Sequence, residues 1–185
     1  PLELSAEQQH VFDELLPNLE DSRPHAALLH GVTGSGKTIV FLRLIQRTLE
    51  LGRKALVLVP EISLTPQMIQ RLKSTFGSRL AVQHSALNNT ERLLQWRMIQ
   101  QGNADIVVGT RSAVFAPLQN LGLIIMDEEQ EHTYQSESAP RYDAHDVAKK
   151  RAVMENALLL FASATPLTET YHAAQSGKLQ LVELK

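Results

Sequence analysis

A glycine-rich segment near the N-terminus has the spacing of a loop that binds phosphate. Residues 31–38 read Gly-Val-Thr-Gly-Ser-Gly-Lys-Thr and match the pattern G-x-x-x-x-G-K-S/T at every fixed position. Glycines allow backbone N–H groups to surround a phosphate, and the positive end of a following helix favours the anion. We expect Lys37 to reach the β- and γ-phosphates of a nucleotide and the Thr38 hydroxyl to bind Mg²⁺. The residues of this loop predicted to bind nucleotide are Gly31, Thr33, Gly34, Ser35, Gly36, Lys37 and Thr38.

A second group of reactive side chains follows the apolar residues 124–126. Residues 127–129 read Asp-Glu-Glu. Ligands of parallel sheets bind outside the carboxyl ends of the strands, so these carboxylates can face the phosphate loop. We expect Asp127 to hold Mg²⁺, directly or through water, and Glu128 to polarise the water that attacks a phosphate. Alone, the cluster could be a solvated acidic turn, but beside a phosphate loop it predicts ATP hydrolysis with Lys37, Asp127 and Glu128 as catalytic residues.

Both groups need strands and helices that bring them together. Several apolar runs are continuous rather than alternating, which is typical of parallel strands covered on both faces. Helix signals separate the runs: Ser5 can start a capping box, Thr65 precedes Pro66, and Asn89 or Thr90 can cap a segment ending near Gln101. We predict a three-layer α/β/α fold, with a mostly parallel sheet of about seven strands and helices on both faces. The expected strands are 26–30, 55–59, 80–84, 105–109, 123–127, 158–162 and 179–184.

Composition limits the possible classes of protein. The chain has 185 residues, 43% hydrophobic and 21% charged, which suits one globular domain and excludes disorder. A net charge of −2 excludes a basic nucleic-acid clamp, so any DNA contact must be local. The absence of cysteine excludes disulfides and thiolate zinc sites and suits a reducing cytoplasm. No apolar run reaches the length of a membrane span, and we expect no membrane partner. The single Trp96 lies at helical spacing from Leu93 and Ile99, which predicts core packing.

The order of these motifs resembles the first RecA-like lobe of superfamily 2 DNA helicases. In that resemblance, Gln8 stands where such helicases carry an adenine-reading glutamine, although it is also the third residue of the capping box. The strings GVTGSGKT, VPEISLTPQ, HSALNNTERLLQW, GTRSAVFAP and DEEQEHTYQSE are similar to the PriA family of replication-restart helicases, from residue 4 to about residue 184. Residues 59–67 match motif Ia, 109–113 motif Ib, 127–130 motif II and 163–166 motif III.

The resemblance also implies residues that contact DNA. Motifs Ia and Ib follow strands at the nucleotide-binding edge, where Thr65, Gln67, Thr110 and Arg111 could donate hydrogen bonds to phosphates of single-stranded DNA. Thr65 could equally be a plain helix cap.

Three further positions are predicted to couple the nucleotide and DNA sites. Ser163 and Thr165 could link the acidic motif to the DNA side, and Gln130 could hydrogen-bond across the site. Gln130 departs from the family, where a histidine is common, and a glutamine cannot titrate near neutral pH.

The polar segment 130–146 corresponds to an aromatic-rich loop in PriA-like and RecQ-like helicases, which couples DNA binding to hydrolysis. We therefore add Arg141 and Tyr142 to the DNA-binding residues, by base stacking. The segment reads P-R-Y-D-A-H-D where W-R-Y-H-A-R-D is familiar, which weakens the stacking argument, and an ordinary solvent loop is the alternative.

The resemblance implies an ATP- and Mg²⁺-dependent helicase of the bacterial cytoplasm and nucleoid. It would act on single-stranded or forked DNA with 3′ to 5′ movement, together with primosome proteins and single-strand-binding protein. Because the chain starts with Pro1 and stops soon after motif III, we expect residues 1–185 to be one lobe of a longer protein. The second RecA-like lobe, a zinc-binding region and an N-terminal DNA-binding domain would lie outside it, and the lobe alone would be nearly inactive. The alternatives are a RecG-like or Mfd-like translocase, a P-loop kinase or switch, and a module that binds nucleotide without hydrolysis.

Overall fold

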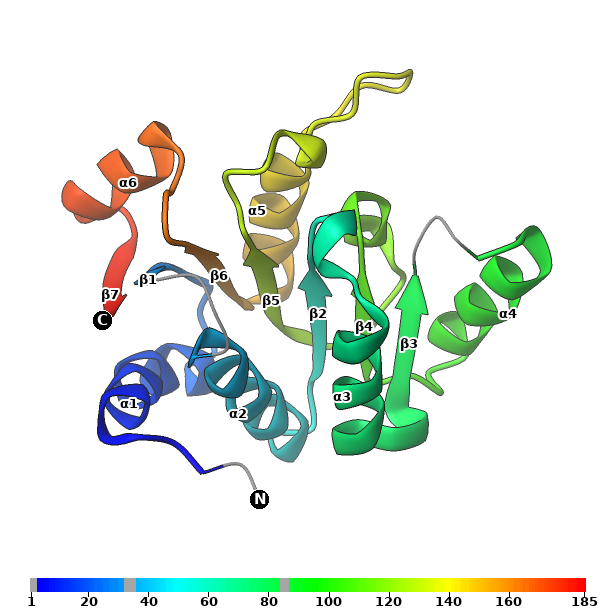
Figure 1. Ribbon diagram of the computed structural model, residues 1–185, viewed down its shortest axis with the longest axis horizontal. Coiled ribbons are helices and arrows are strands. Elements are labelled where there is room, and N and C mark those ends of the chain that lie inside the picture. The colour runs from blue at the N-terminus through cyan, green and yellow to red at the C-terminus, as the bar shows by residue number, and fades with distance from the viewer. Residues whose placement is uncertain (1–2, 32–35, 84–86) are drawn as a thin grey trace.

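A computed structural model describes residues 3–31, 36–83 and 87–185. Within them, seven strands form one sheet in the order β3-β4-β2-β5-β6-β1-β7, and every strand pair is parallel (Figure 1). The predicted parallel α/β architecture is therefore confirmed. The strands are β1 His25–Gly31, β2 Lys54–Leu58, β3 Leu80–Gln83, β4 Ile106–Gly109, β5 Leu121–Asp127, β6 Leu158–Ser163 and β7 Gln180–Leu184.

Helices cover both faces of this sheet. The α-helices are α1 Ala6–Glu20, α2 Gly36–Glu50, α3 Pro66–Phe76, α4 Asn89–Gln100, α5 Ala144–Glu155 and α6 Thr168–Gln175. Short 3₁₀ turns are η1 Glu61–Ser63, η2 Gly77–Arg79, η3 Arg111–Phe115 and η4 His132–Tyr134. Buried side chains of α1, α2 and α3 share one hydrophobic core with the sheet, while those of α4, α5 and α6 share a second core on the other face. The result is a three-layer α/β/α arrangement.

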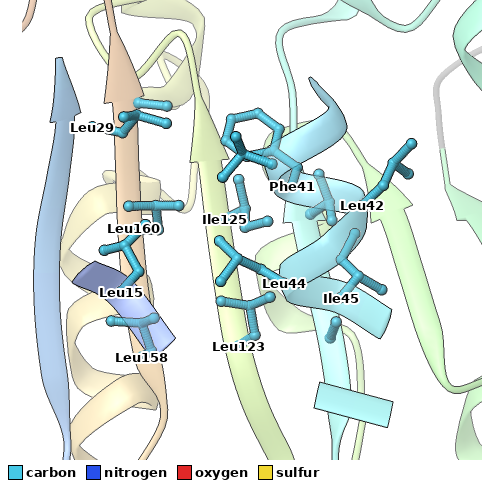
Figure 2. Packing of buried hydrophobic residues seen from close by; sticks show 14 of the residues in the cluster. Leu15, Leu29, Phe41, Leu42, Leu44, Ile45, Leu123, Ile125, Leu158 and Leu160 are labelled. Carbon is cyan, nitrogen blue, oxygen red and sulfur yellow. The ribbon is translucent and has the colours of Figure 1, made fainter. Parts of the chain in front are cut away.

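The continuous apolar strands explain why two cores form. Along β5, Leu123 and Ile125 enter the core of α1 and α2, whereas Ile124 and Met126 enter the core of α5. Successive side chains of a strand point to opposite faces, so a central strand covered on both sides must be apolar throughout. Figure 2 shows Leu123 and Ile125 packed with Leu44 of α2.

Helix caps agree with the sequence patterns, with one shift. Ser5 and Gln8 form a capping box at α1, and the Thr65 hydroxyl accepts a hydrogen bond from the Met68 N–H at α3. The cap of α4 is Asn88, not Asn89 or Thr90, because Glu91 three residues later completes a capping box.

The prediction that Trp96 packs in the core is wrong. Trp96 is half-buried and Leu93 is exposed, while Ile99 alone of this group is fully buried. Helix α4 lies next to the edge strand β3, so little of its apolar surface can reach the sheet. Among the described helices, none is long and apolar enough to cross a membrane.

Candidate functional site

The phosphate-loop region and the acidic motif lie at the carboxyl ends of two strands of the same sheet. Strand β1 ends at Gly31 and is followed by α2 from Gly36, while β5 ends at Asp127. Strand β6 separates β1 from β5 in the sheet. Thr33, Gly34 and Ser35 lie outside the described residues, so their predicted contacts stay predictions. At Gly31 a side chain would clash, because a Cβ would lie 2.9 Å from the Leu184 carbonyl oxygen of β7.

Lys37 brings the two predicted halves of the site together. Its side chain is only 3% exposed, and its Nζ lies 2.8 Å from Glu128 Oε1 and 3.4 Å from Asp127 Oδ1. A buried ammonium requires such partners, because an unpaired charge is costly away from water. Thr38 follows in the first turn of α2 and is half-buried. The three predicted catalytic residues are therefore in direct contact.

The pKa values of Asp127 and Glu128 are shifted in opposite directions. Burial and the neighbouring Glu128 raise the pKa of Asp127, although Lys37 opposes this. Burial also disfavours ionisation of Glu128, but hydrogen bonds from Lys37 and Gln130 outweigh it and lower its pKa. Glu128 adopts φ 49°, a left-handed conformation that is uncommon for a residue other than glycine. Such backbone strain is frequent at functional sites.

Gln8 contacts the phosphate-loop region from the first helix. Its Oε1 accepts a hydrogen bond from the Ser5 N–H at 2.9 Å, and its Nε2 donates to the Gly36 carbonyl at 3.1 Å. The capping interpretation of Gln8 is thus confirmed. The same side chain lies beside the start of α2, and its role in reading adenine stays a prediction.

The predicted coupling residues form a continuous chain of hydrogen bonds. Gln130 Nε2 donates to Glu128 Oε2 at 3.0 Å, and Ser163 Oγ donates to Gln130 Oε1 at 2.5 Å. Ser163 Oγ in turn accepts from the Thr165 N–H at 2.9 Å. Glutamine can make this connection because its amide has both a donor and an acceptor. Motif II and motif III are therefore joined through side chains.

A second buried network, centred on Glu129, was not predicted. The Glu129 carboxylate accepts hydrogen bonds from Thr170 Oγ1 at 2.6 Å and from the Leu167 N–H at 2.7 Å. His145 Nε2 lies 2.6 Å from the Glu129 carbonyl, and its Nδ1 lies 2.5 Å from Asp143 Oδ1. Burial opposes protonation of the ring, but Glu129 and Asp143 outweigh it and raise the pKa of His145 to about 9. These partners come from several elements, so no spacing along the sequence signals them.

Tyr134 belongs to the polar segment 130–146, and its burial was not predicted from the sequence. Its side chain is almost fully buried, and its hydroxyl lies 3.0 Å from the Leu58 carbonyl and 2.6 Å from the Asp127 carbonyl. Leu58 ends β2, directly before motif Ia, and Asp127 ends β5. One hydroxyl therefore connects the strand end of motif Ia to the strand end of motif II.

The residues predicted to contact DNA occupy different environments. Thr65 and Gln67 are exposed on the first turn of α3, and Thr110 is half-buried after β4. Arg111 Nη1 donates to the carbonyls of Thr133 and Gln135, at 3.0 and 3.2 Å. The Arg111 guanidinium thus holds the segment that follows motif II. The sequence predicted Arg111 as a phosphate ligand and did not predict this contact.

The segment 130–146 contains some local structure, although most of its residues are exposed or half-buried. It contains η4 and a bridge between Gln135 and Asp143, and it projects from the sheet edge (Figure 1). Arg141 is exposed, whereas Tyr142 packs against Phe115 with ring centroids 4.9 Å apart and lies beneath Arg111. Tyr142 is therefore already in contact on more than one side.

The donors at the strand ends fit a magnesium–nucleotide complex. Within residues 3–31, 36–83 and 87–185, no cluster of three or more His, Cys, Asp or Glu side chains could hold a metal ion by itself. Mg²⁺ in nucleotide sites is commonly bound by one or two carboxylates together with phosphate oxygens and water. Asp127, Glu128 and the Thr38 hydroxyl are donors of this kind.

Comparisons with known proteins agree with this geometry. Residues 5–173 match the family model of the DEAD/DEAH box helicases. The chain is 49% identical over 185 residues to the replication restart protein PriA of Bacillus subtilis, covering 100% of this chain and 23% of that protein. It is 43% identical to PriA of Chlamydia pneumoniae, again over 100% of this chain and 25% of that protein. The chain thus spans about a quarter of the length of these curated relatives.

The fold also resembles that of solved helicase structures. The structure of RecG bound to a three-way DNA junction matches with a TM-score of 0.70 at 24% identity, covering 100% of this chain and 24% of that one.

Proposed function

Because the chain belongs to the DEAD/DEAH box helicase family, we propose that it is the first RecA-like lobe of a DNA helicase that couples ATP hydrolysis to movement on single-stranded DNA. The observation that carries this proposal is the contact of buried Lys37 with Asp127 and Glu128. A kinase or a nucleotide-dependent switch gives no reason for the Gln130–Ser163–Thr165 connection between two helicase motifs.

Each residue of the site has a separate role in the proposed hydrolysis. Bound Mg²⁺–ATP supplies the γ-phosphoryl group and a divalent charge that offsets the carboxylates. Lys37 carries three N–H donors and can exchange a carboxylate for a phosphate oxygen with little movement. Glu128 would keep its hydrogen bond from Gln130 when Lys37 turns to the phosphate, and would polarise a water molecule for attack. Asp127 and Thr38 would hold the Mg²⁺ ion.

The DNA side of the proposal rests on motifs Ia and Ib. Thr65 and Gln67 are exposed beside the strand ends, where they can donate to phosphates. Arg111 contributes mainly by holding the segment after motif II, and Arg141 is an exposed cation on that segment. The chain of hydrogen bonds from Glu128 to Thr165 leads to the end of β6, on the side of β5 away from motifs Ia and Ib. The link from motif II to the DNA side is instead the Tyr134 hydroxyl, which contacts the ends of β2 and β5.

We further propose a role in restarting stalled replication forks, as the name of the relatives indicates. The longer protein would contain the second RecA-like lobe with its arginine finger, the zinc-binding region and the N-terminal DNA-binding domain. It would move 3′ to 5′ in the bacterial cytoplasm with primosome proteins and single-strand-binding protein. Identities of 43% and 49% to PriA favour this role over that of a RecG-like translocase. Without its second lobe, the chain would hydrolyse ATP slowly and separate no strands.

Titration of a fluorescent ADP analogue with Mg²⁺ tests the nucleotide site. Lys37→Ala should weaken binding about 10-fold or more, because a hydrogen bond to a charged group is lost. Lys178→Ala is the matched control, since Lys178 is exposed and precedes β7, at the amino ends of the strands rather than at the carboxyl ends where the nucleotide site lies. Equal affinity of wild type and Lys37→Ala would contradict the site. An ADP affinity that does not change with single-stranded DNA would favour the kinase or switch alternative.

A further inference from the structure

A pocket of about 820 Å³ lies at the same edge of the sheet as the nucleotide site but does not share its residues. It is formed by α4, by the ends of β2 and β3, and by the turns η3 and η4. Lys37, Asp127 and Glu128 do not line it. Its size lies within the range of about 300–1,000 Å³ that is usual for pockets that bind small organic groups.

Three aromatic side chains line this pocket. Trp96 is half-buried on α4, Phe115 is 49% exposed on η3, and the ring of Tyr134 forms a buried wall. Leu93, also 49% exposed, adds apolar surface. Aromatic and aliphatic side chains that gather in one concave site and remain partly exposed there are typical of a binding surface.

The charges at the pocket favour an anionic chain. Arg92 and Arg111 line it together with a single carboxylate, Glu61, in a protein whose net charge is −2. Arg111 contributes its positive charge from a fixed position, because its Nη1 is bound to the Thr133 and Gln135 carbonyls. Aromatic rings beside guanidinium groups are the combination that recognises unpaired nucleotides, through base stacking and phosphate contacts.

The position of the pocket is continuous with the proposed DNA path. Pro60 and Glu61 of motif Ia form one side, and Thr110 and Arg111 of motif Ib form another. A strand that crosses motifs Ia and Ib would therefore pass over the mouth of the pocket. Hydrogen-bond donors at the rim would hold the phosphate of a nucleotide, and the aromatic rings inside would hold its base.

We propose that this pocket receives an unstacked base of single-stranded DNA, with Trp96 and Phe115 as stacking groups. The inference rests on the proposed function, because it requires that DNA cross motifs Ia and Ib. It goes beyond phosphate contacts, since it assigns a site for the base itself. Tyr134 also connects the pocket with the nucleotide site, because it lines the pocket and its hydroxyl contacts the Asp127 carbonyl.

The single tryptophan of the chain makes the proposal directly measurable. A ten-nucleotide thymidine strand is titrated into the protein while Trp96 fluorescence is followed. The same titration uses a strand of equal length that has abasic sites in place of the bases. We expect the thymidine strand to quench Trp96 and the abasic strand to leave its fluorescence unchanged, because only a base can stack on the indole.

Variants measured by anisotropy of a labelled strand extend the test. Trp96→Ala and Phe115→Ala should each weaken binding of the thymidine strand about 5- to 150-fold, the range for loss of one stacked base. Trp96→Phe should largely restore it. Leu94→Ala is the matched control, since Leu94 is exposed on α4 but does not line the pocket. Far-ultraviolet circular dichroism checks that each variant is folded.

The outcomes separate this inference from the proposed function. Equal binding of the two strands, with no change at Trp96, would overturn the base pocket and leave DNA binding by motifs Ia and Ib intact. Failure to bind either strand would overturn both. In the longer protein, Trp96 could be shielded from solvent and its fluorescence could stay unchanged when DNA is added. That result would assign the pocket to another protein segment and would also overturn the inference.

Discussion

The buried histidine of α5 predicts an unusual dependence of stability on pH. His145 lies between Glu129 and Asp143, and the rings of Tyr134 and Phe161 pack against it. Its pKa is about 9 in the folded chain, against 6.5 for the unperturbed group. Because the folded pKa is the higher one, the folded chain binds the proton more tightly. The resulting stabilisation is fully present below pH 6.5 and is lost as the pH rises through 9.

The size of the effect follows from the difference in pKa. A shift from 6.5 to about 9 corresponds to about 3 kcal/mol, at about 1.4 kcal/mol per unit. Single domains are stable by about 5–15 kcal/mol, so a large share of the free energy of unfolding should disappear between pH 6 and pH 9.5. In urea, this would lower the unfolding midpoint by about 1–3 M.

Urea unfolding of wild type and His145→Gln at pH 6 and pH 9.5 measures this difference. The variant should be less stable than wild type at pH 6, and its stability should change about 3 kcal/mol less between the two pH values. His132→Gln is the matched control, because His132 is exposed and should keep the pH dependence of the wild type. Equal loss of stability by wild type and His145→Gln over this range would refute the assignment of the pH dependence to His145.

Three other substitutions test separate parts of the structure. Gln130→Ala removes the hydrogen bond that holds Glu128, so kcat for ATP in the longer protein should fall about 10-fold, with a smaller change in KM for ATP. Gly109→Ala should destabilise the chain by about 1–3 kcal/mol in urea, because a Cβ would lie 2.6 Å from the Gln83 carbonyl. Tyr134→Phe removes a buried hydroxyl that lies within hydrogen-bond distance of two carbonyls and should cost about 1–3 kcal/mol, measured in the same assay, whereas unchanged stability would show that the hydroxyl contributes nothing to folding.

The strands could be predicted closely because their sequence signal is strong. A central strand such as β5 has to be apolar at every position, and its ends were predicted to within two residues. The acidic cluster and Lys37 could be placed in one site because the carboxyl ends of parallel strands lie at the same edge of the sheet.

The features that sequence analysis missed depend on contacts between distant elements. His145 and Tyr134 bind backbone carbonyls, which leave no pattern in the sequence. Trp96 has the spacing of a core residue, but the sheet order places α4 beside an edge strand, so its apolar face opens onto a pocket. The cap at Asn88 could have been found, because Glu91 follows it at the spacing of a capping box.

The hydroxyl of Tyr134 has a consequence for how this lobe can move. It joins the end of β2 to the end of β5, two neighbouring strands that are also paired through Leu58 and Met126. Any hinge between motif Ia and motif II would have to break hydrogen bonds that are shielded from water, which is costly. Motion in a catalytic cycle is therefore expected to turn both motifs together as one rigid body. The loops beyond the strand ends would then absorb the change in shape.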